Sequence, residues 1–437
     1  MKLRIDLEKE YGIVLEGGGA RGAYQIGVWK ALREAGVKIR GVAGTSVGAL
    51  NGALICMDDL EKAEEIWGTM TYSTVFRVDD PMIAKLKKFG VRSMKMTDAA
   101  AEFKRLFSDR GLDIAPLKKL LEETVDEERI RRSPRDFCAA SFSVTDRKEE
   151  DFDVKEAPPG TMKDMMMASA YFPGFKQEKI GGKTYLDGGS VNNVPVDLLT
   201  DRGYKDIIVI RLYGIGVDRR KFMEIPADVT IHEIAPGRNL GGILEFDSAR
   251  TKKNMKLGYF DGLRFLYGLC GRKYYLDMPY SEAYYFGRIM SELDLFKIWL
   301  KPYVKEDEFA KLTGYRVYTE KIFPFLAKKL RLCSEWDYRD LYGAVLELFA
   351  KKMQLEVYRV YTPDEIVGKI HELLSDKLTV GQRYEENPEI WRKTIKEERS
   401  GANPWRLMPC ISSSGSPWWS CPSFRFLIRR GTCSSFR

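Results

Sequence analysis

Residues 11–57 alternate short apolar runs with helical patterns, and this alternation constrains the fold more than any other feature of the chain. The runs YGIVLE (11–16) and IRGVAG (39–44) have the length of buried strands, and residues 23–36 and 49–57 have the periodicity of helices. A strand, helix, strand, helix order predicts parallel strands joined by right-handed crossovers. We therefore expect an α/β fold with a mostly parallel sheet sandwiched by helices.

The same pattern continues along the first half of the chain and then changes. Further strand candidates lie at 136–145, 183–187, 206–213 and 229–235, and from about residue 275 long, charged helical segments follow. We expect four regions: the core of the α/β domain at 11–200, its remaining strands and helix at 201–270, a helical C-terminal region at 271–398, and a tail at 399–437. The tail is rich in Ser, Trp, Cys, Pro and Arg and is predicted to be disordered, with a membrane-touching tail as the alternative.

Composition excludes several classes of protein. The 437 residues include seven scattered cysteines and two histidines, a pattern that indicates neither a disulfide framework nor a metal site. Five of the eight net positive charges come from arginines in 401–437, which leaves +3 for the first 400 residues and argues against a nucleic-acid partner. No run of eighteen apolar residues occurs and the start of the chain is charged, so we expect a cytoplasmic protein, able to lie on the membrane periphery.

A glycine-rich loop, GGGARG at 17–22, follows the first strand and precedes the first helix. Gly17, Gly19 and Gly22 match the GxGxxG pattern of a dinucleotide-binding loop, but the second strand ends without the acidic residue that holds the ribose. A P-loop is excluded because Ala23 and Tyr24 stand where Lys and Ser or Thr are required. No cofactor and no nucleotide are therefore expected. The loop can turn its N–H groups toward a transient oxyanion, or it can be a purely structural turn.

The stretch GTSVG at 44–48 lies between the second strand and the second helix. In this context Gly-x-Ser-x-Gly forces a sharp turn that exposes the serine hydroxyl, and Gly44 and Gly48 prevent clashes within the turn. Ser46 is then a candidate nucleophile, with the N–H of Val47 as an additional oxyanion donor. The structural alternative is a tight connection packed through small residues.

A nucleophilic serine needs a base, and three residues are candidates. His371 lies in a charged helical pattern and His232 within a strand pattern, rather than in the loop where a triad histidine is usual. Asp187 ends an apolar strand and is followed by Gly188 and Gly189, which let the backbone turn beside it. A strand-end aspartate in this position is also a common turn residue.

The loop, the serine turn and the DGG segment, in this order, resemble the patatin-like phospholipases. The segments MMMASAYFPGF (165–175) and NNVPVDLL (192–199) are also similar to that family, and residues 240–266 resemble a later segment of bacterial members. The resemblance implies that Ser46 is the nucleophile and Asp187 the general base of a Ser/Asp dyad, and that burial raises the basicity of this carboxylate. It implies an oxyanion hole built from Gly17, Gly18, Gly19 and Arg21.

The family resemblance implies hydrolysis of acyl esters of phospholipids or lysophospholipids. Residues 81–96 mix Met, Ile, Leu and Phe with five Lys or Arg and no acid, which fits either transient contact with anionic lipid or a solvated helix face. A small-ester carboxylesterase and a non-catalytic lipid-binding protein remain the alternatives.

Overall fold

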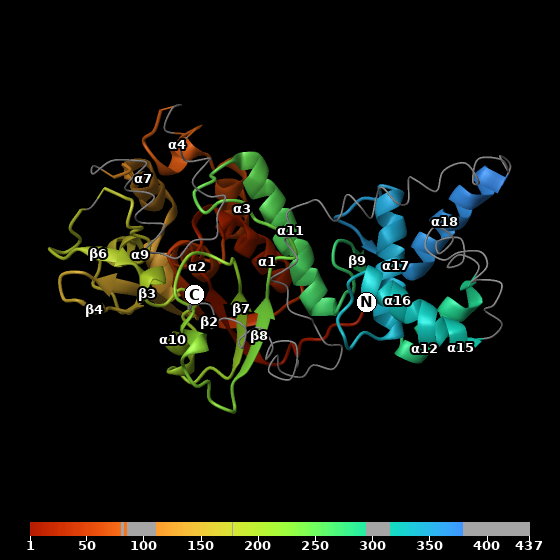
Figure 1. Cartoon of the computed structure of the whole chain (residues 1–437). Coiled ribbons are helices and arrows are strands. Elements are labelled where there is room, and N and C mark those ends of the chain that lie inside the picture. The colour runs from red at the N-terminus through yellow and green to blue at the C-terminus, as the bar shows by residue number, and fades with distance from the viewer. Residues whose placement is uncertain (80–82, 85–110, 177, 294–314, 379–437) are drawn as a thin grey trace, which may run out of the picture. The chain divides into compact units, whose positions relative to one another are not determined.

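The structure, a computed structural model, describes residues 1–79, 83–84, 111–176, 178–293 and 315–378 (Figure 1). It divides into two compact units. The first comprises Met1–Asp277 and Glu356–Tyr361, and the second Met278–Leu355 and Thr362–Arg437. Each unit is described by itself.

The first unit is built on a mixed sheet with a parallel centre. Its strands are β1 (Glu10–Leu15), β2 (Lys38–Thr45), β3 (Asp136–Ser143), β4 (Lys148–Glu149), β5 (Phe152–Asp153), β6 (Tyr185–Asp187), β7 (Asp206–Ile210) and β8 (Thr230–Ile234). The order is β4-β3-β2-β1-β7-β8, and β5 and β6 also pair with β3. The strands β3, β2, β1, β7 and β8 are mutually parallel, whereas β4, β5 and β6 run antiparallel to β3. The expected α/β fold with a mostly parallel sheet is confirmed.

The helices of this unit follow the expected alternation. They are η1 (Gly19–Gly22), α1 (Ala23–Glu34), α2 (Val47–Cys56), α3 (Leu60–Thr69), α4 (Tyr72–Val75), α7 (Ala115–Thr124), α8 (Glu127–Arg132), α9 (Met162–Ser169), η2 (Gly188–Ser190), α10 (Asp197–Thr200), η3 (Arg219–Lys221) and α11 (Ser248–Tyr267). The helix expected at 23–36 ends two residues earlier than predicted, a difference typical of fraying helix ends. A short pair of strands, β9 (Tyr275–Leu276) and β10 (Val360–Tyr361), completes the unit.

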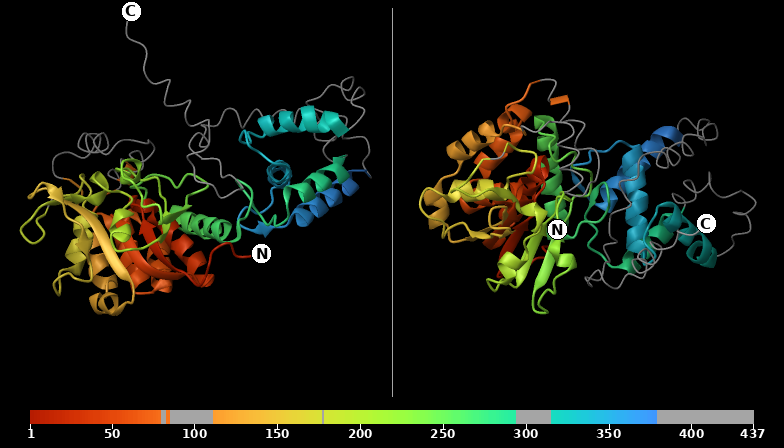
Figure 2. Two further views of the ribbon diagram at one scale, coloured as in Figure 1. Left: turned by 90° about the horizontal axis from the view of Figure 1, so that it is seen from below. Right: turned by 60° about the vertical axis from the view of Figure 1, so that its left-hand side comes forward.

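Alternate residues of the parallel strands point to two separate apolar cores, as the period of two in a strand requires. In β7, Ile208 and Ile210 belong to the core under α1, α2, α3 and α11, whereas Ile207 and Val209 face the core under α10. Both sides of the sheet are covered, as Figure 2 shows. This explains why the strands read as continuous apolar runs in the sequence.

The second unit is helical in its described residues. It contains α12 (Glu282–Ser291), α15 (Tyr315–Val317), η4 (Tyr318–Ile322), α16 (Phe323–Lys329), α17 (Tyr338–Lys352) and α18 (Pro363–Leu378). Its core is apolar and aromatic and includes Phe323, Leu326 and Tyr342. The Tyr342 hydroxyl donates to Glu292 at 2.9 Å, and Arg288 pairs with the same carboxylate at 2.7 Å, which ties α12 to α17.

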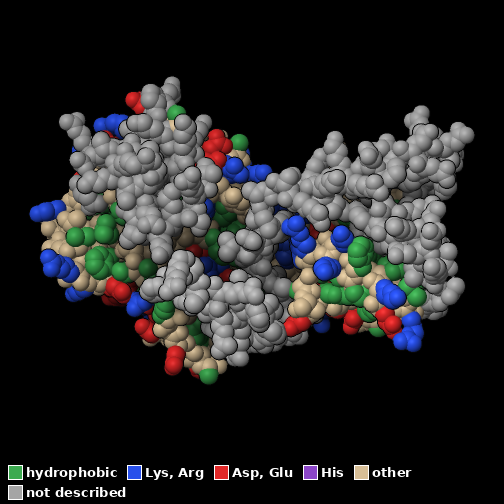
Figure 3. Space-filling view, in the orientation of Figure 1, with side chains coloured by type: hydrophobic (Ala, Val, Ile, Leu, Met, Phe, Trp, Pro, Cys, Tyr) green, Lys and Arg blue, Asp and Glu red, His purple; other side chains and the backbone are tan. Residues whose placement is uncertain are grey.

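Charged side chains of both signs are interspersed over the described residues on the face drawn in Figure 3. Within the described part of the chain, no helix is both long and apolar enough to cross a membrane. The tail at 399–437, and residues 81–96 apart from Ile83 and Ala84, lie outside the described residues.

Candidate active site

Ser46 sits in a strained turn between β2 and α2. Its backbone φ is 56° and its ψ is −125°, a conformation that L-residues rarely adopt. Such strain persists only where the surrounding structure enforces it, and it is the geometry that lifts a nucleophilic serine out of a strand-to-helix turn. Here the Ser46 N–H donates to the hydroxyl of Ser169, at 3.0 Å.

The two glycines of the turn are required by close packing. A Cβ atom on Gly48 would collide with the carbonyl oxygen of Leu15 in β1, and one on Gly44 would collide with the backbone of Gly48. The turn therefore lies directly against the central strand, with no space for a side chain at either position. This local packing is the reason for the GxSxG spacing.

Asp187 ends β6 and is only 3% exposed. Burial raises the pKa of its carboxyl group to about 6, an effect partly opposed by hydrogen bonds from the Ser46 side chain and the Gly189 N–H. The Gly189 N–H lies 2.8 Å from Oδ1. The antiparallel pairing of β6 with β3, in which Asp187 faces Ser141, brings this residue to the serine turn from 141 positions along the chain.

The two histidines have other surroundings. His232 lies in β8 between the rings of Tyr11 and Phe265, with centroids 6.1 and 5.8 Å away. Its Nε2 atom is 3.9 Å from Asp206, and burial lowers its pKa. Asp206 begins β7, so His232 neighbours the amino end of that strand, whereas Ser46 follows the carboxyl end of the parallel strand β2. His371 is an exposed residue of α18 in the second unit.

The glycine loop presents two unused backbone donors. The Gly17 N–H donates to the Asn193 carbonyl at 3.2 Å, and the Ala20 N–H donates to Ile243 at 2.7 Å. The N–H groups of Gly18 and Gly19 meet no acceptor among the described residues. Gly19 has a φ of +55° and lines the same adjoining cavity as Ser46, so this donor and the candidate nucleophile share one space.

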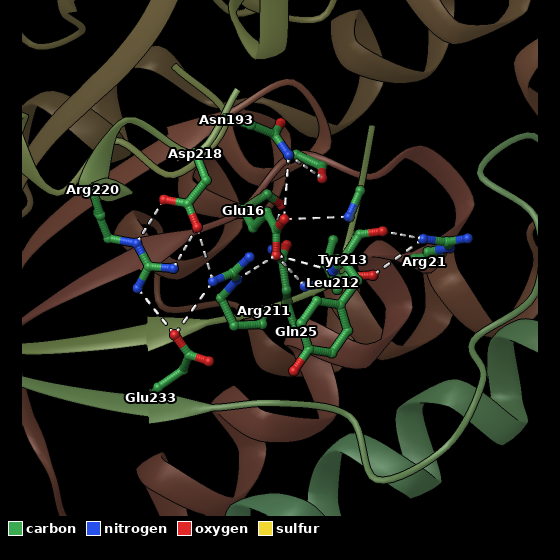
Figure 4. Close-up of polar contacts among 12 residues, drawn as sticks. Glu16, Arg21, Gln25, Asn193, Arg211, Leu212, Tyr213, Asp218, Arg220 and Glu233 are labelled. Carbon is green, nitrogen blue, oxygen red and sulfur yellow. Dashed lines mark hydrogen bonds and ion pairs between the residues drawn. The ribbon is translucent and has the colours of Figure 1, made fainter. Parts of the chain in front are cut away.

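Arg21, also expected in the oxyanion loop, uses its side chain for backbone carbonyls. Its Nε donates to Gly241 at 2.8 Å, and one terminal nitrogen donates to Leu212 at 3.3 Å and to Tyr213 (Figure 4). Its own N–H donates to Gly18 at 3.2 Å. These contacts hold the loop in place from its carboxyl end.

An apolar cavity adjoins Ser46, and its empty volume is ≈ 740 Å³ when the open space at its mouth is included. The lining comes mainly from α2, α3, α4 and α7 and includes Leu50, Leu54, Trp67 and Leu121. The side chain of Asn51, a polar residue of the lining, already has hydrogen-bond partners within the protein. Its amide group donates to Gly22 and Gln25 and accepts from Trp67. The space is therefore suited to a hydrocarbon chain attached to a group that reacts at Ser46.

No cluster of three or more His, Cys, Asp or Glu that could hold a metal ion occurs in the described part of the chain. The thiols of Cys56 and Cys138 are buried, and burial raises their pKa values to about 12. Neither is an accessible thiolate at neutral pH.

Two residues of the site were missed by sequence reasoning. Glu16 ends the predicted strand 11–16, and an acid directly between a buried strand and a glycine loop is the signal that distinguishes it. Ser169 lies within the quoted segment 165–175, but nothing local shows that its hydroxyl reaches Ser46.

These features make Ser46 a candidate nucleophile on an α/β sheet, and comparison with known proteins gives the class of the domain. Residues 13–200 match the family model described as patatin-like phospholipase. The chain thus carries a patatin-like phospholipase domain, which confirms the resemblance seen in the sequence.

The relatives are long proteins of which only a part is matched. The chain is similar to neuropathy target esterase sws of Drosophila melanogaster, with 29% identity over 199 residues, 46% of this chain and 12% of the fly protein. It is also similar to lysophospholipase nte1 of Aspergillus terreus, with 58% identity over 50 residues, 11% of this chain and 3% of the fungal protein. These relatives are eukaryotic, so they do not support the expected bacterial type.

Among solved structures, VipD from Legionella pneumophila aligns over 89% of this chain and 84% of its own, with 14% identity and a TM-score of 0.36.

Proposed function

We propose that this protein is a serine acyl hydrolase that cleaves carboxylic esters of lipids, phospholipids or lysophospholipids, through a Ser46–Asp187 dyad. Ser46 Oγ attacks the ester carbonyl carbon while its proton passes to the Asp187 carboxylate. The ester C–O bond then breaks, and the alcohol leaves with the proton from Asp187. Water attacks the acyl-enzyme, gives its proton to Asp187, and releases the fatty acid as Ser46 regains its hydrogen.

A single observation carries this proposal: a buried carboxylate with a pKa raised to about 6 lies against a serine held in a strained turn. A carboxylate with an ordinary pKa is a weak base for an alcohol, and burial makes this one a better proton acceptor near neutral pH. The N–H groups of Gly18, Gly19 and Val47 stabilise the negative charge that develops on the carbonyl oxygen by donating hydrogen bonds to it. Gly17 and Arg21 support this loop through their own hydrogen bonds.

Lipid is the substrate class that suits the cavity. Its lining is apolar and it begins at the nucleophile, so an acyl chain can be buried while its carbonyl lies at Ser46. The names of the fly and fungal relatives, an esterase and a lysophospholipase, agree with this class. Contact with a membrane surface through residues 81–96 and a cytoplasmic location stay predictions.

The decisive experiment measures hydrolysis of phospholipid, lysophospholipid and a short soluble ester by four proteins: wild type, Ser46→Ala, Asp187→Asn and His232→Ala. We expect the first two substitutions to lower kcat by about 10⁴ or more, and His232→Ala to leave it within a few fold. An inactive, folded His232→Ala protein would contradict the dyad. Activity on the short ester alone would indicate a carboxylesterase, and a wild type that a phosphonate fails to label would indicate a non-catalytic lipid-binding protein.

A further inference from the structure

Glu16, the last residue before the glycine loop, is a buried charge surrounded by hydrogen-bond donors. It is 2% exposed. Its Oε2 accepts from the Leu212 N–H at 2.6 Å, the Tyr213 N–H at 3.0 Å and Arg211 Nε at 2.9 Å. Its Oε1 accepts from the Gly214 N–H at 3.2 Å and from Asn193 Nδ2 at 3.3 Å (Figure 4).

All five partners are donors, and the two oxygens of a carboxylate can accept from all of them. An amide at this position would turn an NH₂ group toward at least one N–H donor, and a buried unpaired donor is destabilising. The arrangement is therefore specific for Glu and not merely for a polar side chain of its size.

The segment that Glu16 holds, residues 211–217, contacts both parts of the proposed catalytic machinery. Gly214 packs against the backbone of Gly17, so no side chain fits there. Further along, the Val217 N–H donates to the Gly189 carbonyl at 2.9 Å, and Val217 in turn accepts from the Asn193 N–H at 2.7 Å. The segment thus lies between the glycine loop and the turn that follows Asp187.

The opposite end of the glycine loop is attached to the same segment. Arg21 donates to the carbonyl oxygens of Leu212 and Tyr213, and Glu16 accepts from the N–H groups of the same two residues. Tyr213 itself is held at a φ of 49°, a strained conformation for a non-glycine residue. Two charges at the two ends of the loop therefore fasten it to one strained segment.

We propose that Glu16 is a positioning residue, which fixes the Gly18 and Gly19 N–H donors relative to Ser46 and Asp187 by anchoring residues 211–217. Oxyanion stabilisation depends on donors held in place before the reaction, because their reorganisation would otherwise add to the barrier. The inference rests on the proposed hydrolase function and deepens it.

The test compares Glu16→Gln with Glu233→Gln. Glu233 also pairs with Arg211, at 3.3 Å, but makes none of the contacts to residues 212–214. We expect Glu16→Gln to lower kcat per active site by about tenfold to a hundredfold, with KM within a few fold, and Glu233→Gln to resemble wild type. Active sites are counted by phosphonate labelling, so partial unfolding does not affect the rate per site.

A second measurement separates positioning from general damage. A trifluoromethyl ketone, whose adduct with Ser46 places an oxyanion in the hole, is expected to bind Glu16→Gln more weakly by the same factor. The corresponding alcohol, which forms no oxyanion, is expected to bind equally to both variants. Equal kcat per site and equal ketone affinity in the Glu16→Gln and Glu233→Gln proteins would overturn the proposal. If Glu16→Gln does not fold, Glu16→Asp, which keeps the charge but shortens its reach, is measured in its place with the same expectation.

Failure of the proposed function gives a different result. A wild type that neither hydrolyses esters nor reacts with the phosphonate contradicts the hydrolase, whatever the role of Glu16. Hydrogen exchange then still tests the anchoring, at the loop N–H groups of Gly17 and Ala20, which are hydrogen-bonded. Glu16→Gln is expected to speed exchange at these two positions relative to Glu233→Gln, and unchanged exchange would contradict the proposal.

Discussion

The hydroxyl of Ser169 accepts the N–H of Ser46 at 3.0 Å and donates to the Ala140 carbonyl at 2.6 Å. This fully buried hydroxyl connects the nucleophile turn to β3, the strand that carries β6 and Asp187. The contact satisfies an N–H group that the strained turn removes from regular pairing. Ser169 therefore connects Ser46 to the strand that pairs with Asp187, the other residue of the proposed dyad.

Ser169→Ala is expected to leave the Ser46 N–H and the Ala140 carbonyl without partners. We expect a loss of about 1 to 3 kcal/mol in the free energy of unfolding and a reduction of several fold in kcat. The matched control is Ser143→Ala, which removes another fully buried hydroxyl, bonded to Asp146 at 3.0 Å. The control is expected to lose stability without a change in kcat, measured by urea unfolding and ester hydrolysis.

The pH dependence of activity should report the protonation of Asp187. Its pKa is raised to about 6, so kcat/KM for a non-ionising ester is expected to rise tenfold per pH unit below that value and to level off above it. A profile that continues to rise to pH 8 would show that another group is the base. His232 serves as the control, because His232→Ala is expected to keep the wild-type profile.

The same pKa shift predicts how Asp187 affects stability. Because the folded-state pKa lies above the ordinary value of 3.8, the ionised form is disfavoured by folding, by about 3 kcal/mol at neutral pH. The contribution of Asp187 to the free energy of unfolding is therefore most favourable below about pH 4, and this advantage is lost as the pH rises to about 6. Asp187→Asn is expected to stabilise the protein at pH 7.5 and not at pH 4.

The cavity predicts a limit on acyl chain length. Val47, Leu50, Asn51 and Leu54 line it at helical spacing, so it follows one face of α2. Leu54 lies eight residues after Ser46, or about 12 Å along the helix. An extended hydrocarbon advances about 1.25 Å per carbon, so about nine or ten carbons fit before Leu54.

Leu54→Ala is expected to move the preferred chain length upward in a series of p-nitrophenyl esters. Leu257→Ala, which removes a buried leucine that does not line the cavity, should lower stability to a similar degree and leave the preference unchanged. Identical chain-length profiles for the two variants would place the acyl chain elsewhere.

Gly48→Ala is expected to prevent formation of the serine turn, because its Cβ atom would collide with the Leu15 carbonyl oxygen. We expect a destabilisation of about 2 kcal/mol or more and loss of phosphonate labelling. Gly36→Ala is the control: this glycine has a φ of +80° and no atom within 4 Å of the added Cβ, so only the backbone penalty of about 1 kcal/mol applies. Thermal unfolding of both variants would distinguish packing from conformational strain.

Much of the fold could be predicted because its signals are local. Continuous apolar runs, typical of strands in a sheet covered on both faces, occur at 11–16, 39–44, 136–145 and 206–213. The structure has a strand at each of these places. The β4 and β5 strands were not predicted, because each is only two residues long and carries no pattern of its own.

The residues of the candidate site also differ in how well the local sequence predicts them. Gly44, Ser46 and Gly48 lie together in one short stretch between a strand and a helix, so the candidate nucleophile could be proposed from the sequence. Asp187 could be named only by weighing it against two histidines and by family resemblance, since nothing near it in the sequence shows that it meets Ser46.

The sequence by itself determined the order of strands and helices and the position of the turn that carries Ser46, because both depend mainly on interactions within a few residues. Only the tertiary structure decided the proximity of Ser46 and Asp187, the raised pKa of that carboxylate, and the contacts of Glu16 and Ser169. Pairing of distant strands brings these residues together and removes them from water. Neither desolvation nor a long-range contact can be predicted from the local sequence.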